Sequence, residues 1–314
     1  MKTQKDLSIP KNYKDALPEL RGKTFDWNME FSSKTRLTTG NITHYSIRGA
    51  IPFGNLVLVP GLASNTQTEP LMCALTYWAL THKYNVYAID TFLGDFKPEI
   101  SDELAAKHTL PEFIDLVDVG MNIVEKMSIN KWNCVIGHSL GGAGILSVFN
   151  RRITHNLPIG CSAAVLFAPF VTQEWHIVIK NILKDRQRPN LSQEEFYKHA
   201  VGLVSPHILF DESTVRYVSI FPKFYDDTDA LKPCPELMAK YDIPTTLVAG
   251  GKDRKAPIKY ARSVYNSVLE HSSNPKINFV EFPESKHSFM NQHNDWSSVL
   301  KLIKSQYIRT KGIK

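Results

Sequence analysis

Residues 137–142, Gly-His-Ser-Leu-Gly-Gly, constrain the fold of this chain more than any other feature. They stand between an apolar run at 132–136 and a helix-forming segment of small and apolar residues at 143–149. A Gly-x-Ser-x-Gly pattern in this context is typical of a strand that enters a very tight turn and leaves it as a helix, with the serine hydroxyl at the top of a sheet. Gly137 and Gly141 suit that turn because the strand and the helix pack there without room for a side chain. The pattern predicts that the serine is activated.

Two strands further along the chain each end beside a residue that such a serine needs. A nucleophilic serine works with a histidine base, and the histidine works with an acid that orients it. An apolar strand at 244–249 leads into a Gly-Gly-Lys-Asp turn that ends at Asp253. A short apolar strand at 278–282 leads into the loop that carries His287. The chain order is therefore serine, aspartate, histidine.

Other residues compete for the roles of base and acid. His293 is the main rival for the base, but it leads into the final helix, whereas His287 directly follows a strand. The aspartates at 226, 227 and 229 belong to a different region of the chain and are weaker candidates than Asp253. We therefore favour Asp253 and His287.

On these residues the chain resembles the α/β-hydrolases. The matching features are the Gly-x-Ser-x-Gly turn around Ser139, the Gly-x-x-Asp turn that carries Asp253 and the loop that carries His287. The resemblance covers about residues 30–310. It implies that His138, inside the turn, points away from the nucleophile and has a structural role.

The resemblance also implies acyl transfer through a covalent intermediate on Ser139. His287 would take the proton of the serine hydroxyl during the attack on a carbonyl carbon and then pass it to the leaving group. Asp253 would hold the imidazole in the productive tautomer and stabilise the imidazolium.

Two backbone N–H groups are expected to stabilise the oxyanion. One belongs to Leu140, the residue after the nucleophile. The other, by resemblance, belongs to Leu62, which follows an apolar strand at 56–59 and a Pro-Gly turn. The loop contains no His-Gly-Gly-Gly run, which in the family favours medium or long acyl chains.

Apolar strands alternate with helices along most of the chain, which predicts a mostly parallel, doubly wound α/β sheet. We expect the first two strands to be joined by a turn at 39–41 (Thr-Gly-Asn) and to form an antiparallel edge. The strands are expected at 30–37, 42–48, 56–59, 85–89, 132–136, 163–167, 244–249 and 278–282, and the helices at 68–80, 109–127, 143–149 and from about 295.

The alternation stops between 167 and 244, where helix-like and aromatic-rich segments at 172–184, 192–204 and 212–221 intervene. Loops of this length inside a domain are usually functional. By resemblance we expect a helical cap at 169–243, inserted after the sixth strand, with the α/β-hydrolase core at 29–168 and 244–314 and an N-terminal extension at 1–28. Most of the aromatic residues must pack the cap onto the core, and a few are expected to line an acyl pocket.

The composition excludes several classes of partner. The net charge is +6 over 314 residues, but the lysines are scattered, so we expect no nucleic acid partner. Association with a membrane surface stays open without being indicated. No stretch of eighteen apolar residues could span a membrane, and no apolar run follows the first residues, so we expect no secretory signal.

Cys73, Cys134 and Cys161 are expected to be reduced core residues. Cys73, Cys134, Cys161 and Cys234 are widely spaced and form no Cys-x-x-Cys pair. Most of them lie in apolar segments, as in a cytoplasmic protein. No metal site is expected, and acyl transfer through serine requires no cofactor.

The sequence therefore predicts a serine hydrolase that cleaves carboxylic esters, such as a medium- or long-chain acyl ester, a monoacylglycerol or a lysophospholipid. Acyltransferase, thioesterase or amidase activity on the same catalytic residues is an open alternative, and so is a non-catalytic ligand-binding homologue. The physiological substrate and the oligomeric state stay open.

Overall fold

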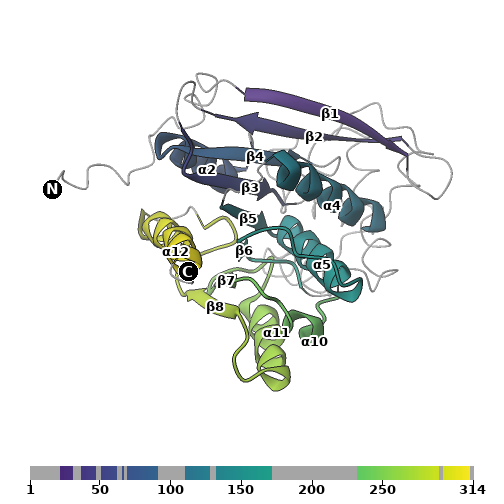
Figure 1. Ribbon diagram of the computed structural model, residues 1–314. Coiled ribbons are helices and arrows are strands. Elements are labelled where there is room, and N and C mark those ends of the chain that lie inside the picture. Colours follow the sequence, from purple (N-terminus) through teal and green to yellow (C-terminus); the bar gives the residue numbers. More distant parts are fainter. Residues whose placement is uncertain are drawn as a thin grey trace, which may run out of the picture.

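Eight strands form one sheet in the computed structural model (Figure 1), which describes residues 22–30, 37–46, 51–61, 66, 69–90, 110–127, 132–171, 232–289 and 293–311. They are β1 (Gly22–Glu30), β2 (Leu37–Tyr45), β3 (Gly54–Val59), β4 (Tyr84–Asp90), β5 (Asn133–His138), β6 (Ala163–Phe167), β7 (Thr245–Gly250) and β8 (Ile277–Phe282). Their order in the sheet is β1-β2-β4-β3-β5-β6-β7-β8. The six strands β3 to β8 are parallel to one another, whereas β2 is antiparallel to both β1 and β4. The predicted mostly parallel sheet with an antiparallel edge is confirmed.

The sheet buries an apolar cluster on each face because its central strands are apolar on both sides. Val57 and Val135 belong to one cluster, and Leu56 and Ile136 belong to the other. Helices from both sides complete the clusters: α4 (Leu110–Met127), α5 (Leu140–Thr154) and α11 (Ile258–His271) on the first face, and α2 (Pro70–Thr81) and α12 (His293–Lys311) on the second (Figure 1). This is the doubly wound arrangement.

Most helices agree with the sequence pattern, but α11 and the short helix α10 (Pro235–Met238) were not expected. α2, α4 and α5 lie where helices were expected, and α12 begins slightly before its expected start. The sequence pattern was not read as a helix at α11, although its buried Ala261, Val264 and Val268 recur at helical spacing. Within the described ranges, none of the helices combines the length and the apolar character needed to cross a membrane.

The position of the first two strands was predicted wrongly. The expected turn at 39–41 lies inside β2, where Gly40 pairs with Trp27 of β1 and Asn41 pairs with both Asp26 and Asp90. A Gly-Asn pair is only a local preference for a turn, and pairing with strands on both sides outweighs it. β1 begins at Gly22, within the segment 1–28 that we expected to be an N-terminal extension.

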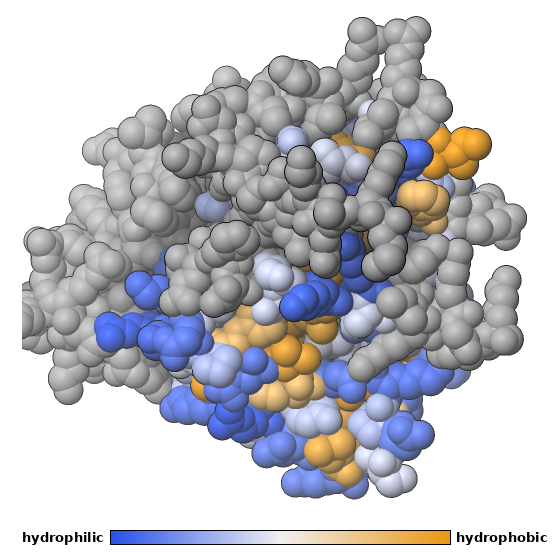
Figure 2. Space-filling view, turned by 90° about the vertical axis from the view of Figure 1, so that its left-hand side faces the viewer, coloured by the Kyte–Doolittle hydropathy of each residue, from blue (hydrophilic) through white to orange (hydrophobic). Residues whose placement is uncertain are grey.

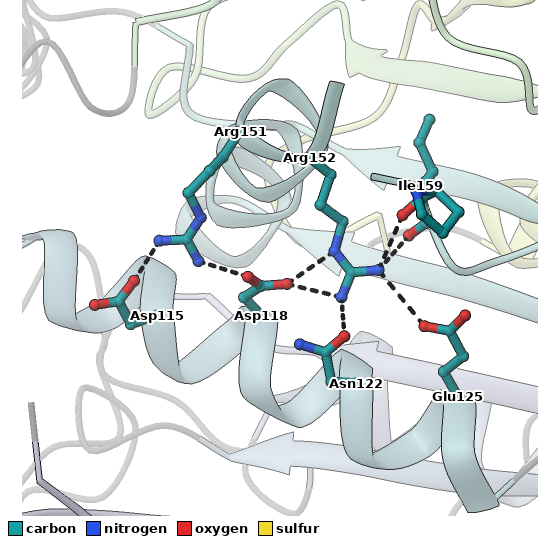
Figure 3. A network of polar contacts seen from close by, with 8 residues as sticks. Asp115, Asp118, Asn122, Glu125, Arg151, Arg152 and Ile159 are labelled. Atoms are coloured by element: carbon teal, nitrogen blue, oxygen red, sulfur yellow. Dashed lines mark hydrogen bonds and ion pairs between the residues drawn. The ribbon is translucent and has the colours of Figure 1, made fainter. Parts of the chain in front are cut away.

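Polar contacts attach α4 to α5, the helix that follows Ser139 (Figure 3). Arg152 is buried, and its guanidinium donates to Asp118 Oδ1 at 2.8 Å, to Asn122 Oδ1 at 2.7 Å and to the Ile159 carbonyl at 2.7 Å. Arg151 donates to Asp118 as well, at 2.8 Å. A buried arginine is tolerated when its donors are satisfied in this way. The network therefore fixes α5 against α4.

The predicted cap helices at 172–184, 192–204 and 212–221 lie outside the described residues. The described chain resumes at Lys232 and forms the short helix α10 (Pro235–Met238). Tyr241, just beyond it, donates its hydroxyl to Asn150 Oδ1 at 2.7 Å and packs edge-on against Phe149. The end of the segment 169–243 therefore packs on the core through α5.

The surface of the described residues is mostly hydrophilic. On the face drawn in Figure 2, hydrophilic residues surround a smaller hydrophobic area. The large apolar side chains that are exposed come from separate places in the chain, and they are Ile51, Phe53, Leu157 and Leu269. Exposed apolar residues at separate positions are normal for a protein surface.

Candidate active site

Ser139 lies on a sharp turn between the end of β5 and the start of α5, as the sequence predicted. Its backbone has φ 51° and ψ −118°, a conformation that costs a non-glycine residue on the order of 1–3 kcal/mol. The Ser139 N–H donates to the Phe167 carbonyl at 2.9 Å, and the Ser139 carbonyl accepts from the N–H of Phe170 at 3.0 Å. Neighbouring β6 and the residues after it therefore hold the strained turn in place.

Both glycines of the turn are required, but for different contacts. A Cβ on Gly137 would lie 2.7 Å from Cα of Gly142, so Gly137 lets the strand pack on the helix, as expected. A Cβ on Gly141 would lie 2.3 Å from the carbonyl oxygens of Val59 and Pro60. Gly141 therefore serves the contact with the end of β3 rather than with β5.

Asp253 and His287 are in direct contact. Nδ1 of His287 lies 2.8 Å from Oδ2 of Asp253, whose side chain is fully buried. Oδ1 of Asp253 accepts the backbone N–H groups of Lys255 at 2.8 Å and Ala256 at 2.9 Å. Burial alone would raise the pKa of Asp253, but His287 and the two N–H groups outweigh it, so the pKa lies below the usual value. Asp253 is thus an ionised acceptor.

Backbone contacts hold the loops of Asp253 and His287 together. The Gly251 N–H donates to the Phe282 carbonyl at 2.9 Å, and the Lys252 N–H donates to the Ser285 carbonyl at 3.0 Å. A Cβ on Gly251 would lie 2.3 Å from the Pro283 carbonyl oxygen, so only glycine allows this approach. The pairing of β7 with β8 continues in this way into the turns that carry both side chains.

His287 has the properties of a neutral base. Its ring is largely buried, and burial lowers the pKa, whereas the charge of Asp253 raises it and the nearby His138 and Lys255 lower it again. The net result is a pKa below the usual value. The carboxylate of Asp253 can only accept, so Nδ1 carries the proton of the neutral ring. Nε2 then holds a lone pair.

The turn of Ser139 is linked to this pair through His138, and Ser139 itself makes no hydrogen bond to the described side chains of the pair. The ring of His138, the residue before Ser139, has its centroid 4.7 Å from that of His287. Between the described side chains of Ser139 and His287 there is no hydrogen bond. Two of the three predicted residues are therefore in direct contact, and the residue before the third, His138, lies beside the His287 ring. Catalytic hydrogen bonds are often longer before a substrate binds.

The rival residues are placed differently or lie outside the described residues. His293 is the first residue of α12, as the sequence suggested. The aspartates at 226, 227 and 229 are outside the described residues.

Of the two residues expected to donate to the oxyanion, the structure describes Leu140 but not Leu62. Leu140 is the first residue of α5, where backbone N–H groups have no partner within the helix. Leu62 lies outside the described residues. Its neighbour Gly61 is close to the nucleophile, because a Cβ on Gly61 would lie 3.2 Å from Cβ of Ser139. Thr66, later in the same loop, donates its N–H to Asp90 Oδ1 at 2.8 Å.

A second carboxylate–histidine pair, which was not predicted from the sequence, lies beside the first. Oε1 of Glu69, just before α2, lies 2.5 Å from Nδ1 of His138, and both side chains are buried. Oε2 of Glu69 accepts the Gly61 N–H at 2.8 Å, and Nε2 of His138 donates to the His287 carbonyl at 2.8 Å. His138 was expected to be structural, but Glu69 was not noticed. A Glu directly before the proline that opens a helix was the available signal.

The described residues contain no group of three or more His, Cys, Asp or Glu side chains placed to hold a metal ion. The four cysteines are free thiols, as expected for Cys73, Cys134 and Cys161. Burial raises the pKa of the Cys134 thiol far above its usual value, so this residue is no nucleophile.

Comparison with known proteins supports the fold. No family model matches the chain, and no curated protein is similar to it in sequence. Among solved structures, it is similar to the esterase Pf2001 of Pyrococcus furiosus, with a TM-score of 0.60, 14% identity, and coverage of 95% of this chain and 96% of that one. It is also similar to Est1E of Butyrivibrio proteoclasticus, with a TM-score of 0.56, 12% identity, and coverage of 91% and 99%. The chain has the α/β-hydrolase fold.

Proposed function

We propose that this protein is a serine hydrolase that cleaves carboxylic esters through an acyl-enzyme on Ser139. The contact between Asp253 and His287, made beside a strained serine turn, carries this proposal. An oriented, neutral imidazole next to a serine at the start of a helix is the arrangement that activates a hydroxyl for attack on a carbonyl.

In the proposed reaction the His287 Nε2 takes the hydroxyl proton while the Ser139 Oγ forms a bond to the carbonyl carbon. The oxyanion of the tetrahedral intermediate accepts the Leu140 N–H and, by resemblance to the family, the Leu62 N–H. The imidazolium gives its proton to the departing alcohol as the ester bond breaks. Water then attacks the acyl-enzyme by the same route, with His287 again as base, and releases the acid.

Medium- or long-chain acyl esters, including monoacylglycerols and lysophospholipids, are the proposed substrate class. The single-glycine form of the loop after β3 supports this class by resemblance, and two similar structures are named as esterases. An aromatic cap at 169–243 would supply the apolar surface that an acyl chain requires.

The proposal is tested by labelling with a fluorophosphonate probe, followed by peptide mapping. The wild-type protein and Ser147→Ala should react at Ser139, whereas Ser139→Ala should not. Ser147 is a matched control because it lies in the same helix, where its hydroxyl donates only to the Ala143 carbonyl at 3.1 Å. A folded wild-type protein that gains no adduct would favour the ligand-binding alternative.

A second measurement sharpens the substrate class. Turnover of p-nitrophenyl esters of increasing acyl length should rise from short to medium chains. Matched thioester and amide substrates, and added alcohol acceptors, separate ester hydrolysis from thioesterase, amidase and acyltransferase activity. Faster cleavage of the thioester or amide, or preferential transfer to an alcohol, would replace the ester hydrolase proposal.

A further inference from the structure

The pair Glu69–His138 joins three of the segments that the proposed reaction uses. Glu69 accepts the Gly61 N–H at 2.8 Å, so it holds the start of the loop in which Leu62 is the expected oxyanion donor. His138 precedes the nucleophile in the turn. Through Nε2 it donates to the backbone carbonyl of His287 at 2.8 Å. One buried side-chain pair therefore joins the loop after β3, the nucleophile turn and the loop of the base.

The contacts fix how many protons the pair holds. The His287 carbonyl can only accept, so Nε2 of His138 carries a proton. Nδ1 lies 2.5 Å from Glu69 Oε1. Burial lowers the pKa of His138, but the Glu69 carboxylate outweighs it, so the pKa lies above its usual value and the ring favours a second proton. With an imidazolium ring and a carboxylate, the pair as a whole is neutral. A neutral pair can be buried at low cost, whereas either partner alone could not.

The position of Glu69 at the start of a helix favours a carboxylate as the partner of His138. It directly precedes Pro70, the first residue of α2, so its carboxylate stands at the positive end of the helix dipole. Other ionisable groups near His138 are Asp253 and His287 from the two loops at the ends of β7 and β8. Asp253 is occupied by His287 and by backbone N–H groups, which leaves Glu69 as the carboxylate that contacts His138.

We propose that Glu69 and His138 are positioning residues, which align Gly61, the nucleophile turn and the His287 backbone for the reaction without taking part in proton transfer. This proposal rests on the proposed function for its kinetic consequences. It places the effect of the pair on kcat rather than on KM, because both side chains are buried and their contacts align the groups that react. A misplacement of about 1 Å can cost on the order of 10²-fold in rate.

Three substitutions separate the contacts of Glu69 with Gly61 and His138 from the contact of His138 with the His287 carbonyl. Glu69→Gln keeps all of them, because the amide oxygen can accept from Gly61 and the amide N–H can donate to a neutral His138. His138→Asn keeps a donor near the Nδ1 position but removes the link to the His287 carbonyl. Glu69→Ala removes the contacts to Gly61 and His138 together. We expect kcat to stay within about fivefold for Glu69→Gln, to fall about tenfold for His138→Asn and to fall about 10²-fold for Glu69→Ala, with KM within about threefold throughout.

Asn55→Ala is the control for a merely structural loss. Asn55 donates to Asn133 Oδ1 at 2.7 Å in a buried contact at the start of β3, the opposite end of the strand from Gly61. It should lower stability but leave kcat unchanged. Unchanged kcat in Glu69→Ala, equal losses in Glu69→Ala and Glu69→Gln, or a loss confined to KM would overturn the positioning role.

Hydrogen exchange of the Gly61 amide provides a readout that does not depend on turnover. Exchange should become faster in Glu69→Ala and stay slow in Glu69→Gln and Asn55→Ala. Should the wild-type protein hydrolyse no ester, the proposed function fails, and the exchange measurement alone decides about the pair. Should Glu69→Ala fail to fold, kcat decides: equal kcat in Glu69→Gln and His138→Asn would contradict the proposal.

Discussion

Two carboxylate–histidine pairs lie side by side in this protein, and their histidines respond to their surroundings in opposite directions. Both rings are largely buried, and their centroids are 4.7 Å apart. Burial lowers the pKa of each, and a carboxylate raises it. The net pKa of His287 nevertheless lies below the usual value, whereas that of His138 lies above it.

The number of acceptors around each ring explains the difference. His138 meets an acceptor at both nitrogens, Glu69 at Nδ1 and the His287 carbonyl at Nε2, so both positions favour a proton. Among the described residues, His287 meets an acceptor at Nδ1 alone, and His138 and Lys255 add unfavourable charge. One pair is therefore suited to hold its protons, and the other keeps a nitrogen free for proton transfer. Two pairs of similar composition can serve different roles.

The largest difference between the pairs should appear when each histidine is replaced. His287→Gln removes the proposed base, and kcat/KM for ester hydrolysis should fall by about 10⁴–10⁶. His138→Asn should cost only about tenfold, as argued above, because it alters position and not proton transfer. Steady-state kinetics on a p-nitrophenyl ester measures both. Equal losses would mean that the two pairs are not divided in this way.

The second-largest loss of activity should follow the replacement of Asp253, the acid that contacts His287. Asp253→Asn keeps the shape of the side chain, but its amide can donate to Nδ1 and so stabilise the tautomer that carries the proton on Nε2. The expected loss in kcat is about 10⁴-fold, with little change in KM. Glu69→Gln, the equivalent change in the second pair, should stay within about fivefold. A loss of less than tenfold in Asp253→Asn would contradict the role of Asp253.

The turn between the pairs should be sensitive to a single methyl group. In Gly141→Ala the new Cβ would collide with the backbone oxygens of Val59 and Pro60, so the turn must shift. We expect kcat to fall by about 10²-fold and the free energy of unfolding to fall by about 1–3 kcal/mol. Gly142→Ala is the control, because its Cβ would be 3.1 Å from the Pro169 side chain and could be accommodated by a small shift. Urea unfolding and ester kinetics give both values, and an equal effect in the two variants would speak against the collision.

The smallest effect should be an opposite pH dependence of stability. His287, with its lowered pKa, stabilises the fold above its unfolded pKa of about 6.5 and loses this contribution as the pH falls. His138, with its raised pKa, stabilises the fold below about 6.5 and loses this contribution as the pH rises through its folded pKa. The slope is limited to about 1.4 kcal/mol per pH unit for each group.

Urea unfolding between about pH 5 and pH 8.5, around the usual histidine pKa, tests these slopes. The stability difference between wild type and His287→Gln should widen as the pH rises, and that between wild type and His138→Asn should narrow. Parallel slopes would show that the two histidines do not differ in the folded protein.

Much of this site could be predicted because Ser139, Asp253 and His287 each closely follow a strand that is rich in apolar residues. Ser139, Asp253 and His287 could be found in this way, since the ends of parallel strands meet at one edge of the sheet. Glu69 could not, because its contacts join three segments that are distant in the sequence and form only when β3, β5 and β8 are assembled. The turn at 39–41 was misplaced for a related reason, because a local turn preference gave way to strand pairing.

The most direct test of the division between the two pairs is an NMR titration of the protein with ¹⁵N-labelled histidine rings, assigned with His287→Gln and His138→Asn. We expect His287 to titrate below the usual pKa of about 6.5 and to carry its proton on Nδ1 when neutral. His138 should titrate above that value and keep protons on both nitrogens to a higher pH than His287 does. Two histidines that titrate together, or in the reverse order, would contradict the account.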